Sequence, residues 1–333
     1  MIFTDVKRVH LELTDKCNAA CPMCMRTNAS GLKPESFIKN SELTLQNIKH
    51  IFPKKVLKNI DHFSFCGVLG DPAIATECLE IAEYISPIQI DMDTNGSLRK
   101  TDWWYNLGKI FSKNKKSVIN FHLDGLEDTH HLYRIKTNFN KIIKNAQAFM
   151  KGGGKANWEF IVFGHNEHQI DEAEKRSKEL GFKSFILKRS KRNDKIRSYT
   201  DKEGKEHKIY PPSNNYLPNK KTEKEYLNSQ NKKFIDCKVS KNNRVYVQYD
   251  GMLHPCCYIA ADTWKTNLDI NLIYNMYDTN TLNLLKNPSG SIVNIAKNNE
   301  IFMEIKNEWK NFNPSTCDRV CGKRYNSVRE IRK

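Results

Sequence analysis

The chain has 333 residues, with 54 Lys and Arg, 38 Asp and Glu, and a net charge of +16 at neutral pH. Its length allows one large domain and a smaller one, and no apolar run of about eighteen residues predicts a membrane span. The first residues lack the charged-then-apolar pattern of an export signal, so we expect a cytoplasmic protein. Its ten cysteines then predict metal ligands, because disulfides are rare in the cytosol.

Short apolar segments alternate with amphipathic segments from the start of the chain to Leu187. The predicted strands are Val9–Leu13, His62–Cys66, Ile88–Asp93, Val118–Leu123, Trp158–Phe163 and Ser184–Leu187. The predicted helices are Ser41–Leu57, Thr76–Ile85, Thr101–Phe111, Phe139–Met150 and Glu167–Leu180. This alternation predicts an α/β fold with a parallel sheet and helical crossovers, and with its chemistry at the carboxyl ends of the strands.

The segment Cys17-Asn-Ala-Ala-Cys21-Pro-Met-Cys24 follows the first predicted strand. This spacing lets one short loop wrap three thiolates around a single inorganic cluster. A four-iron cubane normally takes four cysteine ligands, so three ligands leave one iron open for a small molecule. Zinc fits less well, because structural zinc sites close with a fourth ligand and no further cysteine occurs before Cys66.

The motif resembles the signature of the radical S-adenosylmethionine (SAM) superfamily. The resemblance implies an open (β/α)6 partial TIM barrel over residues 1–189, with a catalytic [4Fe–4S] cluster on Cys17, Cys21 and Cys24. It further implies that the reduced cluster cleaves SAM to a 5′-deoxyadenosyl radical. The electron would come from an external one-electron reductant such as flavodoxin or ferredoxin.

The resemblance extends to the ends of the later strands. Leu69-Gly-Asp-Pro72 resembles the family's Gly-Gly-Glu-Pro motif, with Leu for the first Gly and Asp for Glu. His122 stands where many relatives have Ser or Thr, and Arg134 matches an Arg whose planar guanidinium grips the SAM carboxylate. Asn95-Gly96 is also an ordinary turn and Asn166 an ordinary helix N-cap. The residues that the resemblance assigns to SAM binding are Met23, Leu69, Gly70, Asp71, Thr94, Asn95, His122, Asp124, Arg134 and Asn166.

Residues 190–235 form a basic segment between the predicted barrel and a second cysteine-rich region. Residues 188–233 hold 14 Lys and Arg against 6 Asp and Glu, with few aromatic residues. This composition is typical of a solvated, partly flexible connector, and its charge would also suit a nucleic acid such as RNA. We favour the connector, because the whole chain is rich in Lys, Asn and Ile together.

Residues 236–325 contain the second cysteine set. Cys237, Gly251 and Cys256 have the spacing that opens a SPASM auxiliary-cluster domain, but only Cys317-x3-Cys321 follows. The region therefore resembles the shorter twitch domain, which implies a small α+β domain with a second, auxiliary [4Fe–4S] cluster on Cys237, Cys256, Cys317 and Cys321. Cys257 is an adjacent spare, and structural zinc on the same thiolates is the alternative. Asp250-Gly251 predicts a β-hairpin, and Ile301–Trp309 a helix.

The resemblance implies hydrogen-atom abstraction from an unactivated carbon. An auxiliary cluster that accepts an electron would favour net oxidation, either dehydrogenation or crosslinking, of a small polyol or sugar or of a peptide. His122, His165 and Asp93 are candidates for the base by position. RNA modification through the basic connector and a non-enzymatic iron–sulfur module are the alternatives. The second fits poorly, because an electron carrier needs no SAM-binding strand ends.

Overall fold

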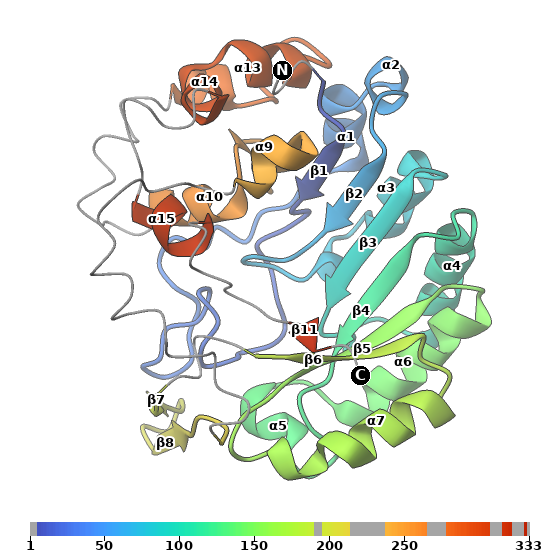
Figure 1. The fold of residues 1–333 in the computed structure, drawn as a ribbon, viewed down its shortest axis with the longest axis vertical. Coiled ribbons are helices and arrows are strands. Elements are labelled where there is room, and N and C mark those ends of the chain that lie inside the picture. The colour runs from blue at the N-terminus through green and yellow to red at the C-terminus, as the bar shows by residue number, and fades with distance from the viewer. Residues whose placement is uncertain are drawn as a thin grey trace. The chain divides into compact units, whose positions relative to one another are not determined.

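The computed structural model describes residues 5–189, 195–213, 237–264, 278–306, 315–321 and 330–331. The chain forms two compact units that interleave along the sequence (Figure 1). The first consists of Met1–Leu13, Ser41–Phe65 and Lys221–Asn326, and the second of Thr14–Asn40, Cys66–Lys220 and Ser327–Lys333. The domain boundaries predicted after residues 189 and 235 stay a prediction.

The first unit holds four strands in the order β10-β9-β1-β2. β1 (Arg8–Leu11) pairs in parallel with β2 (His62–Phe65) and with β9 (Arg244–Val247), and β10 (Leu253–His254) pairs antiparallel with β9. The predicted hairpin at Asp250-Gly251 is therefore confirmed, and Gly251 has the positive φ of +84° that such a turn requires. The helices are α1 (Leu45–Ile51), α2 (Lys54–Leu57), α9 (Lys238–Asn242), α10 (Cys257–Trp264), α12 (Thr279–Leu282), α13 (Ile292–Asn298), α14 (Glu300–Lys306) and α15 (Ser315–Cys321).

The second unit holds the parallel strands β3 (Gln89–Thr94), β4 (Val118–His122), β5 (Ala156–Ile161) and β6 (Ser184–Lys188), in that order. β11 (Glu330–Ile331) pairs antiparallel with β6, and β7 (Arg197–Thr200) forms a separate hairpin with β8 (Glu206–Ile209). The helices are η1 (Pro72–Ile74), α3 (Cys78–Ile85), α4 (Thr101–Ser112), α5 (His130–Tyr133), α6 (Phe139–Lys151), η2 (Glu167–Gln169) and α7 (Ile170–Glu179). Helices α4, α6 and α7 lie along one side of these strands (Figure 1).

The two faces of the β3–β6 sheet differ in chemistry. Alternate residues are apolar and buried, among them Met92, Phe121 and Trp158. The residues between them are polar: Asp91, Asp93, Asn120, His122, Asn157 and Glu159. Because side chains on a strand alternate between faces, one face carries the aromatic core and the other carries polar groups. A closed barrel fills its interior with branched apolar side chains, so a polar inner face points to binding.

The predicted elements are confirmed with small shifts in their ends. All six predicted strands are present, each within about two residues of its predicted bounds. The helix predicted for Ser41–Leu57 is two helices, α1 and α2, which end and begin on either side of Pro53, because proline has no N–H to continue a helix. Ile301–Trp309 is helical to Lys306, and its last three residues lie outside the described ranges. No helix in the described part of the chain is long and apolar enough to cross a bilayer.

Candidate active site

The three cysteines of the first motif lie together in the second unit. Cys21 is buried in an apolar cluster that includes Tyr133 and Phe163, and Cys17 and Cys24 pack against the same cluster. Burial raises the pKa of Cys21 to about 11, and the nearby Cys24 adds to the rise, while Arg134 opposes it. The thiols are thus close enough to disfavour one another's negative charge. A metal centre that needs thiolates would bind here with loss of protons.

Two polar side chains point at these sulfur atoms. The Asn95 amide donates to Cys17 Sγ at 3.7 Å, and Arg134 Nη1 lies 3.9 Å from Cys21 Sγ. A cation and an amide donor both stabilise thiolate sulfur, and hydrogen bonds to sulfur are among the groups that tune iron–sulfur clusters. Three gathered thiols with such donors fit a [4Fe–4S] cluster.

Asp71 connects two of the predicted SAM-binding loops. Its carboxylate accepts hydrogen bonds from Ala73 N at 3.0 Å, Thr94 Oγ1 at 2.8 Å and Asn95 N at 2.7 Å, and it is buried. Gly70 precedes it, where a Cβ would lie 1.9 Å from Thr14 O, so only glycine allows this close approach. Leu69 is buried beside it. The carboxylate therefore orders the Thr94–Asn95 turn, and its predicted contact with the SAM amino group stays a prediction.

Arg134 is held by two neighbours at the end of β4. Its Nε donates to Asp124 Oδ2 at 2.6 Å, and its Nη2 lies 3.1 Å from His122 Nδ1. Asp124 is fully buried, and its other oxygen accepts from Ile161 N at 2.7 Å. Its Nη1 lies on the side of Cys21, and the contact of Arg134 with the SAM carboxylate stays a prediction. Glu127 lies near Arg134 in the sequence and could have been its partner at the surface, but it forms an ion pair with Arg176 instead.

Two predicted SAM contacts have other roles in the structure. Asn166 is buried, and its side chain donates to Ile161 O at 3.0 Å and accepts from Phe163 N at 2.7 Å. It stands at the N-cap position of η2, but its side chain closes the turn after β5 and makes no cap hydrogen bond. Met23 packs against the apolar cluster around Cys21. Contacts of either residue with SAM stay predictions.

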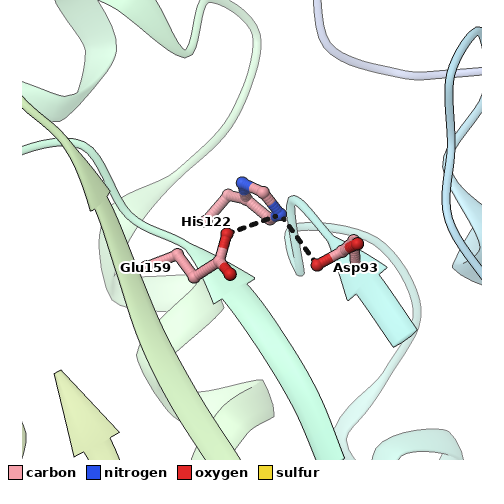
Figure 2. Close-up of side chains that lie close together, drawn as sticks. All are labelled: Asp93, His122 and Glu159. Carbon is pink, nitrogen blue, oxygen red and sulfur yellow. Dashed lines mark ion pairs between the residues drawn. The ribbon is translucent and has the colours of Figure 1, made fainter. Parts of the chain in front are cut away.

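The ends of β3, β4 and β5 bring three ionisable side chains together (Figure 2). His122 Nε2 lies 3.5 Å from Asp93 Oδ1 and 3.5 Å from Glu159 Oε2. Lys188, the last residue of β6, pairs with the same Glu159 oxygen at 2.5 Å. Burial would raise the pKa of Asp93, but the hydrogen bond from His122 and the charge of Lys188 hold it well below the usual range. Asp93 is therefore an ionised carboxylate at neutral pH.

Residues 11–176, which include the cysteine loop and the ends of β3, β4 and β5, match the Radical SAM superfamily. The chain belongs to the radical SAM superfamily. Members of this superfamily are enzymes, and membership implies SAM and a SAM-binding [4Fe–4S] cluster. No curated protein sequence matches the chain.

Solved structures resemble this radical SAM chain in fold. Streptococcus suis SuiB bound to precursor peptide SuiA has a TM-score of 0.53 and 15% identity, and the match covers 95% of this chain and 76% of that one. Native anSMEcpe with bound AdoMet and Cp18Cys peptide has a TM-score of 0.53 and 16% identity, with coverage of 94% and 88%. Together with the α/β architecture, these likenesses support the predicted partial-barrel fold.

The β7–β8 hairpin is a part of this radical SAM site that the sequence did not predict. It falls in the segment interpreted as a connector, where Tyr199 and Ile209 are buried in the apolar cluster around Cys21. Thr200 N donates to Ala29 O at 2.9 Å and Gly31 N to Thr200 O at 3.0 Å. The hairpin is thus hydrogen-bonded to the chain just after the cysteine loop and forms a wall beside the thiols.

Replacing Tyr199 by Ala should open that wall. A buried aromatic removed from a packed cluster costs about 3 kcal/mol and leaves a cavity. We expect a lower thermal midpoint, and faster loss of the visible absorption of the reconstituted protein in air. Ser198→Ala, on the exposed side of the same strand, is the matched control. Equal rates of bleaching in Tyr199→Ala and Ser198→Ala would show that the hairpin does not protect the site.

Arg134→Lys should weaken SAM binding with no change in iron content. Lysine keeps the charge but cannot hold Asp124 and His122 and a SAM carboxylate together. The loss of one hydrogen bond to a charged group costs about 1.5–3 kcal/mol, which is roughly a 10- to 150-fold rise in Kd. Calorimetric titration with SAM measures it. Arg176→Lys is the control: it changes a guanidinium that makes two hydrogen bonds to Glu127 at the surface, and it should leave the Kd for SAM unchanged. An unaltered Kd in Arg134→Lys would contradict the assignment of Arg134 to the SAM carboxylate.

The second cysteine set lies together in the first unit. Cys317 is buried, and its pKa is raised by burial and by the neighbouring Cys256, Cys237 and Cys321. All four predicted ligands are therefore neighbours. Their ligation of a cluster stays a prediction.

Cys257, the spare cysteine, has different neighbours. Burial raises its pKa to about 11, Arg244 opposes the rise, and Glu12 and Cys321 add to it. Glu12 accepts a short hydrogen bond from the Tyr246 hydroxyl. Cys257 thus borders the cysteine set on the side of β1 and β9.

The distances between the sulfur atoms within each cysteine set can be compared with those of a zinc site. Tetrahedral zinc with bonds of about 2.3 Å holds its sulfur ligands roughly 3.8 Å apart. In the described residues, the one group of three potential ligand atoms within 4.8 Å of one another is Asp93, His122 and Glu159. No three sulfur atoms of either set, all of which the structure describes, lie within 4.8 Å of one another, and the choice between zinc and an iron–sulfur cluster stays a prediction.

Proposed function

We propose that the chain is a radical SAM enzyme that cleaves SAM at a cluster held by Cys17, Cys21 and Cys24 and abstracts a hydrogen atom from a peptide. The observation that carries the proposal is the gathering of these thiols beside Asn95 and Arg134. When bound and reduced, the cluster supplies the electron that cleaves SAM to a 5′-deoxyadenosyl radical.

The surrounding residues bind and orient SAM. Arg134, fixed on Asp124, is the partner for the SAM carboxylate, and its planar guanidinium defines the direction of approach. Asp71 fixes the Asn95 turn, so that the amide reaches Cys17. Tyr133, Phe163 and Tyr199 exclude water from the sulfur side of the site.

A peptide substrate is favoured over a small polyol or sugar. Two structures that share the fold at a TM-score of 0.53 contain bound peptides, SuiA in one and Cp18Cys peptide in the other. Their identities of 15% and 16% support the fold, and the transfer of a peptide substrate to this chain is our inference.

We further propose a net oxidation, with a second [4Fe–4S] cluster on Cys237, Cys256, Cys317 and Cys321. The neighbouring thiols around Cys317 support this ligand set. Among the three base candidates, His165 stacks on Phe163 and burial lowers its pKa to about 4, so it is neutral at pH 7. An oxidoreductase of this kind would draw its electron for SAM cleavage from a flavodoxin or ferredoxin.

Anaerobic reconstitution with iron and sulfide, followed by SAM and dithionite, tests the proposal. We expect 5′-deoxyadenosine and methionine in equal amounts, separated by chromatography. A reconstituted protein that binds SAM and forms no 5′-deoxyadenosine would refute it.

A further inference from the structure

The hairpin of β7 and β8 in the second unit has two different faces (Figure 1). Side chains on a strand alternate between its faces. Tyr199 and Ile209 lie on the inner face, where they are buried in the apolar cluster around Cys21. Ser198 and Lys208 are register partners between them and are exposed, so they lie on the outer face. The two strands that wall the thiols on one side therefore present the other side to solvent.

Two large apolar side chains are exposed together at the open end of the hairpin. Ile196 directly precedes β7 and Tyr210 directly follows β8, one position beyond the register partners Arg197 and Ile209. Their exposed fractions are 51% and 53%, and the described residues include only three other exposed side chains of this kind. The Tyr210 carbonyl accepts a hydrogen bond from Gly164 N at 3.0 Å, which fixes the backbone here. Neighbouring exposed apolar side chains are typical of an interaction surface, whereas a single one is ordinary.

Lysine side chains accompany this apolar pair. Three of them belong to the hairpin segment, are exposed, and form no ion pair within the described residues: Lys195, Lys205 and Lys208. Lys33, also exposed, is a fourth. A Cβ on Gly31 would lie 3.9 Å from both Lys33 Cε and Asp201 O, which places this lysine beside the turn of the hairpin.

The acids of the hairpin are mostly engaged. Asp201 Oδ2 lies 2.7 Å from His207 Nε2, and Glu203 pairs with Lys202 at 3.5 Å. In the part of the chain that the structure describes, Glu206 is the one acidic side chain of the hairpin without an ion pair. Four such lysines against one such acid give this face a net positive charge, which favours an anionic partner.

An apolar pair with basic neighbours, next to buried thiols, suits a transient electron-transfer contact. Such contacts bury less than about 1,200 Å² and depend on complementary charge for fast association. Tyr199 and Ile209 lie between this face and the cluster around Cys21, so a protein docked here would be one layer of side chains away from the thiols. RNA would also suit the lysines, but RNA recognition does not require a position beside the thiols.

We propose that this docking face binds a flavodoxin that reduces the first cluster, and that it consists of Ile196, Tyr210, Lys33, Lys195, Lys205 and Lys208. The inference rests on the proposed function for the cluster, and on the hairpin for the surface. A flavodoxin is an acidic protein that exposes the apolar edge of its flavin, so its acids match the lysines and its flavin edge the apolar pair. One electron leaves the anionic flavin hydroquinone, which becomes the neutral semiquinone, and enters the oxidised cluster without transfer of a proton.

The test follows electron transfer from a fully reduced bacterial flavodoxin to the reconstituted protein. Anaerobic stopped-flow measures the appearance of the flavin semiquinone, and the Cys17→Ala/Cys21→Ala/Cys24→Ala variant gives the background from any other centre. Lys205→Glu/Lys208→Glu should lower the second-order rate constant at least about 10-fold at about 0.1 M salt. The difference should close near 1 M salt, where the Debye length is about 3 Å.

A double variant on α6 is the matched control. Lys141 and Lys144 are exposed on this helix, and Lys141→Glu/Lys144→Glu makes the same change in net charge. At about 0.1 M salt the Debye length is about 10 Å, so charges far from the docking face are screened. The rate constant should therefore stay within about 2-fold of the wild-type value.

Dithionite separates docking from a structural effect. It is a small reductant that needs no docking face, so Lys205→Glu/Lys208→Glu should form 5′-deoxyadenosine from SAM and dithionite at the wild-type rate. Ile196→Ser/Tyr210→Ser should also slow the reaction with flavodoxin, and this loss should persist near 1 M salt because an apolar contact is not screened. A lysine variant that also lost the reaction with dithionite would have a damaged site, which would overturn the inference.

The outcomes distinguish this inference from the proposed function. Equal rate constants for the wild type and Lys205→Glu/Lys208→Glu overturn the inference even if the wild-type protein forms 5′-deoxyadenosine with dithionite. An unchanged rate constant together with lost binding of a single-stranded RNA oligomer would assign the lysines to RNA instead. Electron transfer from flavodoxin that depends on the lysines supports the inference even if no 5′-deoxyadenosine forms from SAM, in which case the proposed function is what fails.

Discussion

Replacement of Cys17, Cys21 and Cys24 by Ala should abolish the formation of 5′-deoxyadenosine. The reconstituted wild-type protein should hold about eight irons in two four-iron clusters, and the triple variant about four. Asn95 and Arg134 donate to the cysteine sulfur atoms and are not themselves ligands for iron. Without the three thiols, the first cluster therefore cannot be held beside the residues that we expect to bind SAM. Iron analysis and chromatography of the reaction mixture measure both effects.

Cys78→Ala is the matched control for the triple variant. Cys78 is a buried cysteine in α3 and no predicted ligand, so its loss should leave iron content and SAM cleavage as in the wild type. Circular dichroism of both variants must match the wild-type spectrum. If the triple variant still formed 5′-deoxyadenosine, the assignment of the first cluster would be wrong.

The strands and long helices were predictable because their patterns are local. In β3 the alternation of buried Ile90 and Met92 with Asp91 and Asp93 is visible in the sequence as a period of two. In α6 the spacing of Ile142, Ala146 and Phe149 gives a period of 3.6. The β7–β8 hairpin was missed because its strands are short and mostly polar. Its two buried side chains, Tyr199 and Ile209, are held by contacts with distant residues.

The residues of the candidate site were also predictable where the sequence pattern is local, and unpredictable where their grouping depends on how the strands pair. The cysteine loop was predictable because its ligands lie within eight residues of one another, and Arg134 because it follows a recognisable segment. The grouping of Asp93, His122 and Glu159 was not, because it depends on the register of three strands. The sequence placed Asp93 and His122 at strand ends. It did not indicate that Asn157 would donate to Asn120, and Asn120 to Asp93, across three neighbouring strands. Nor could the sequence show that the Asp71 and Asn166 side chains would accept hydrogen bonds from backbone N–H groups of nearby loops.

A Cys317→Ala/Cys321→Ala variant should lose about four of about eight irons and all turnover of the peptide substrate, and should keep slow SAM cleavage. The two cysteines lie in α15 of the first unit, whereas the groups assigned to SAM belong to the second unit. Because metal binding to a small cysteine-rich region also contributes folding energy, circular dichroism and limited proteolysis must show that the variant is folded.

Single substitutions at Cys256 and Cys257 decide which of the adjacent cysteines is a ligand. Cys256 is a neighbour of Cys237 and Cys317, whereas Cys257 lies toward Arg244 and Glu12. Cys256→Ala should therefore lose the same four irons as the double variant, and Cys257→Ala should lose none. The reverse result would move the fourth ligand to Cys257. Recovery of zinc from the wild-type protein in place of the second set of irons would leave these cysteines a structural role and exclude them from electron transfer, because zinc has no redox chemistry.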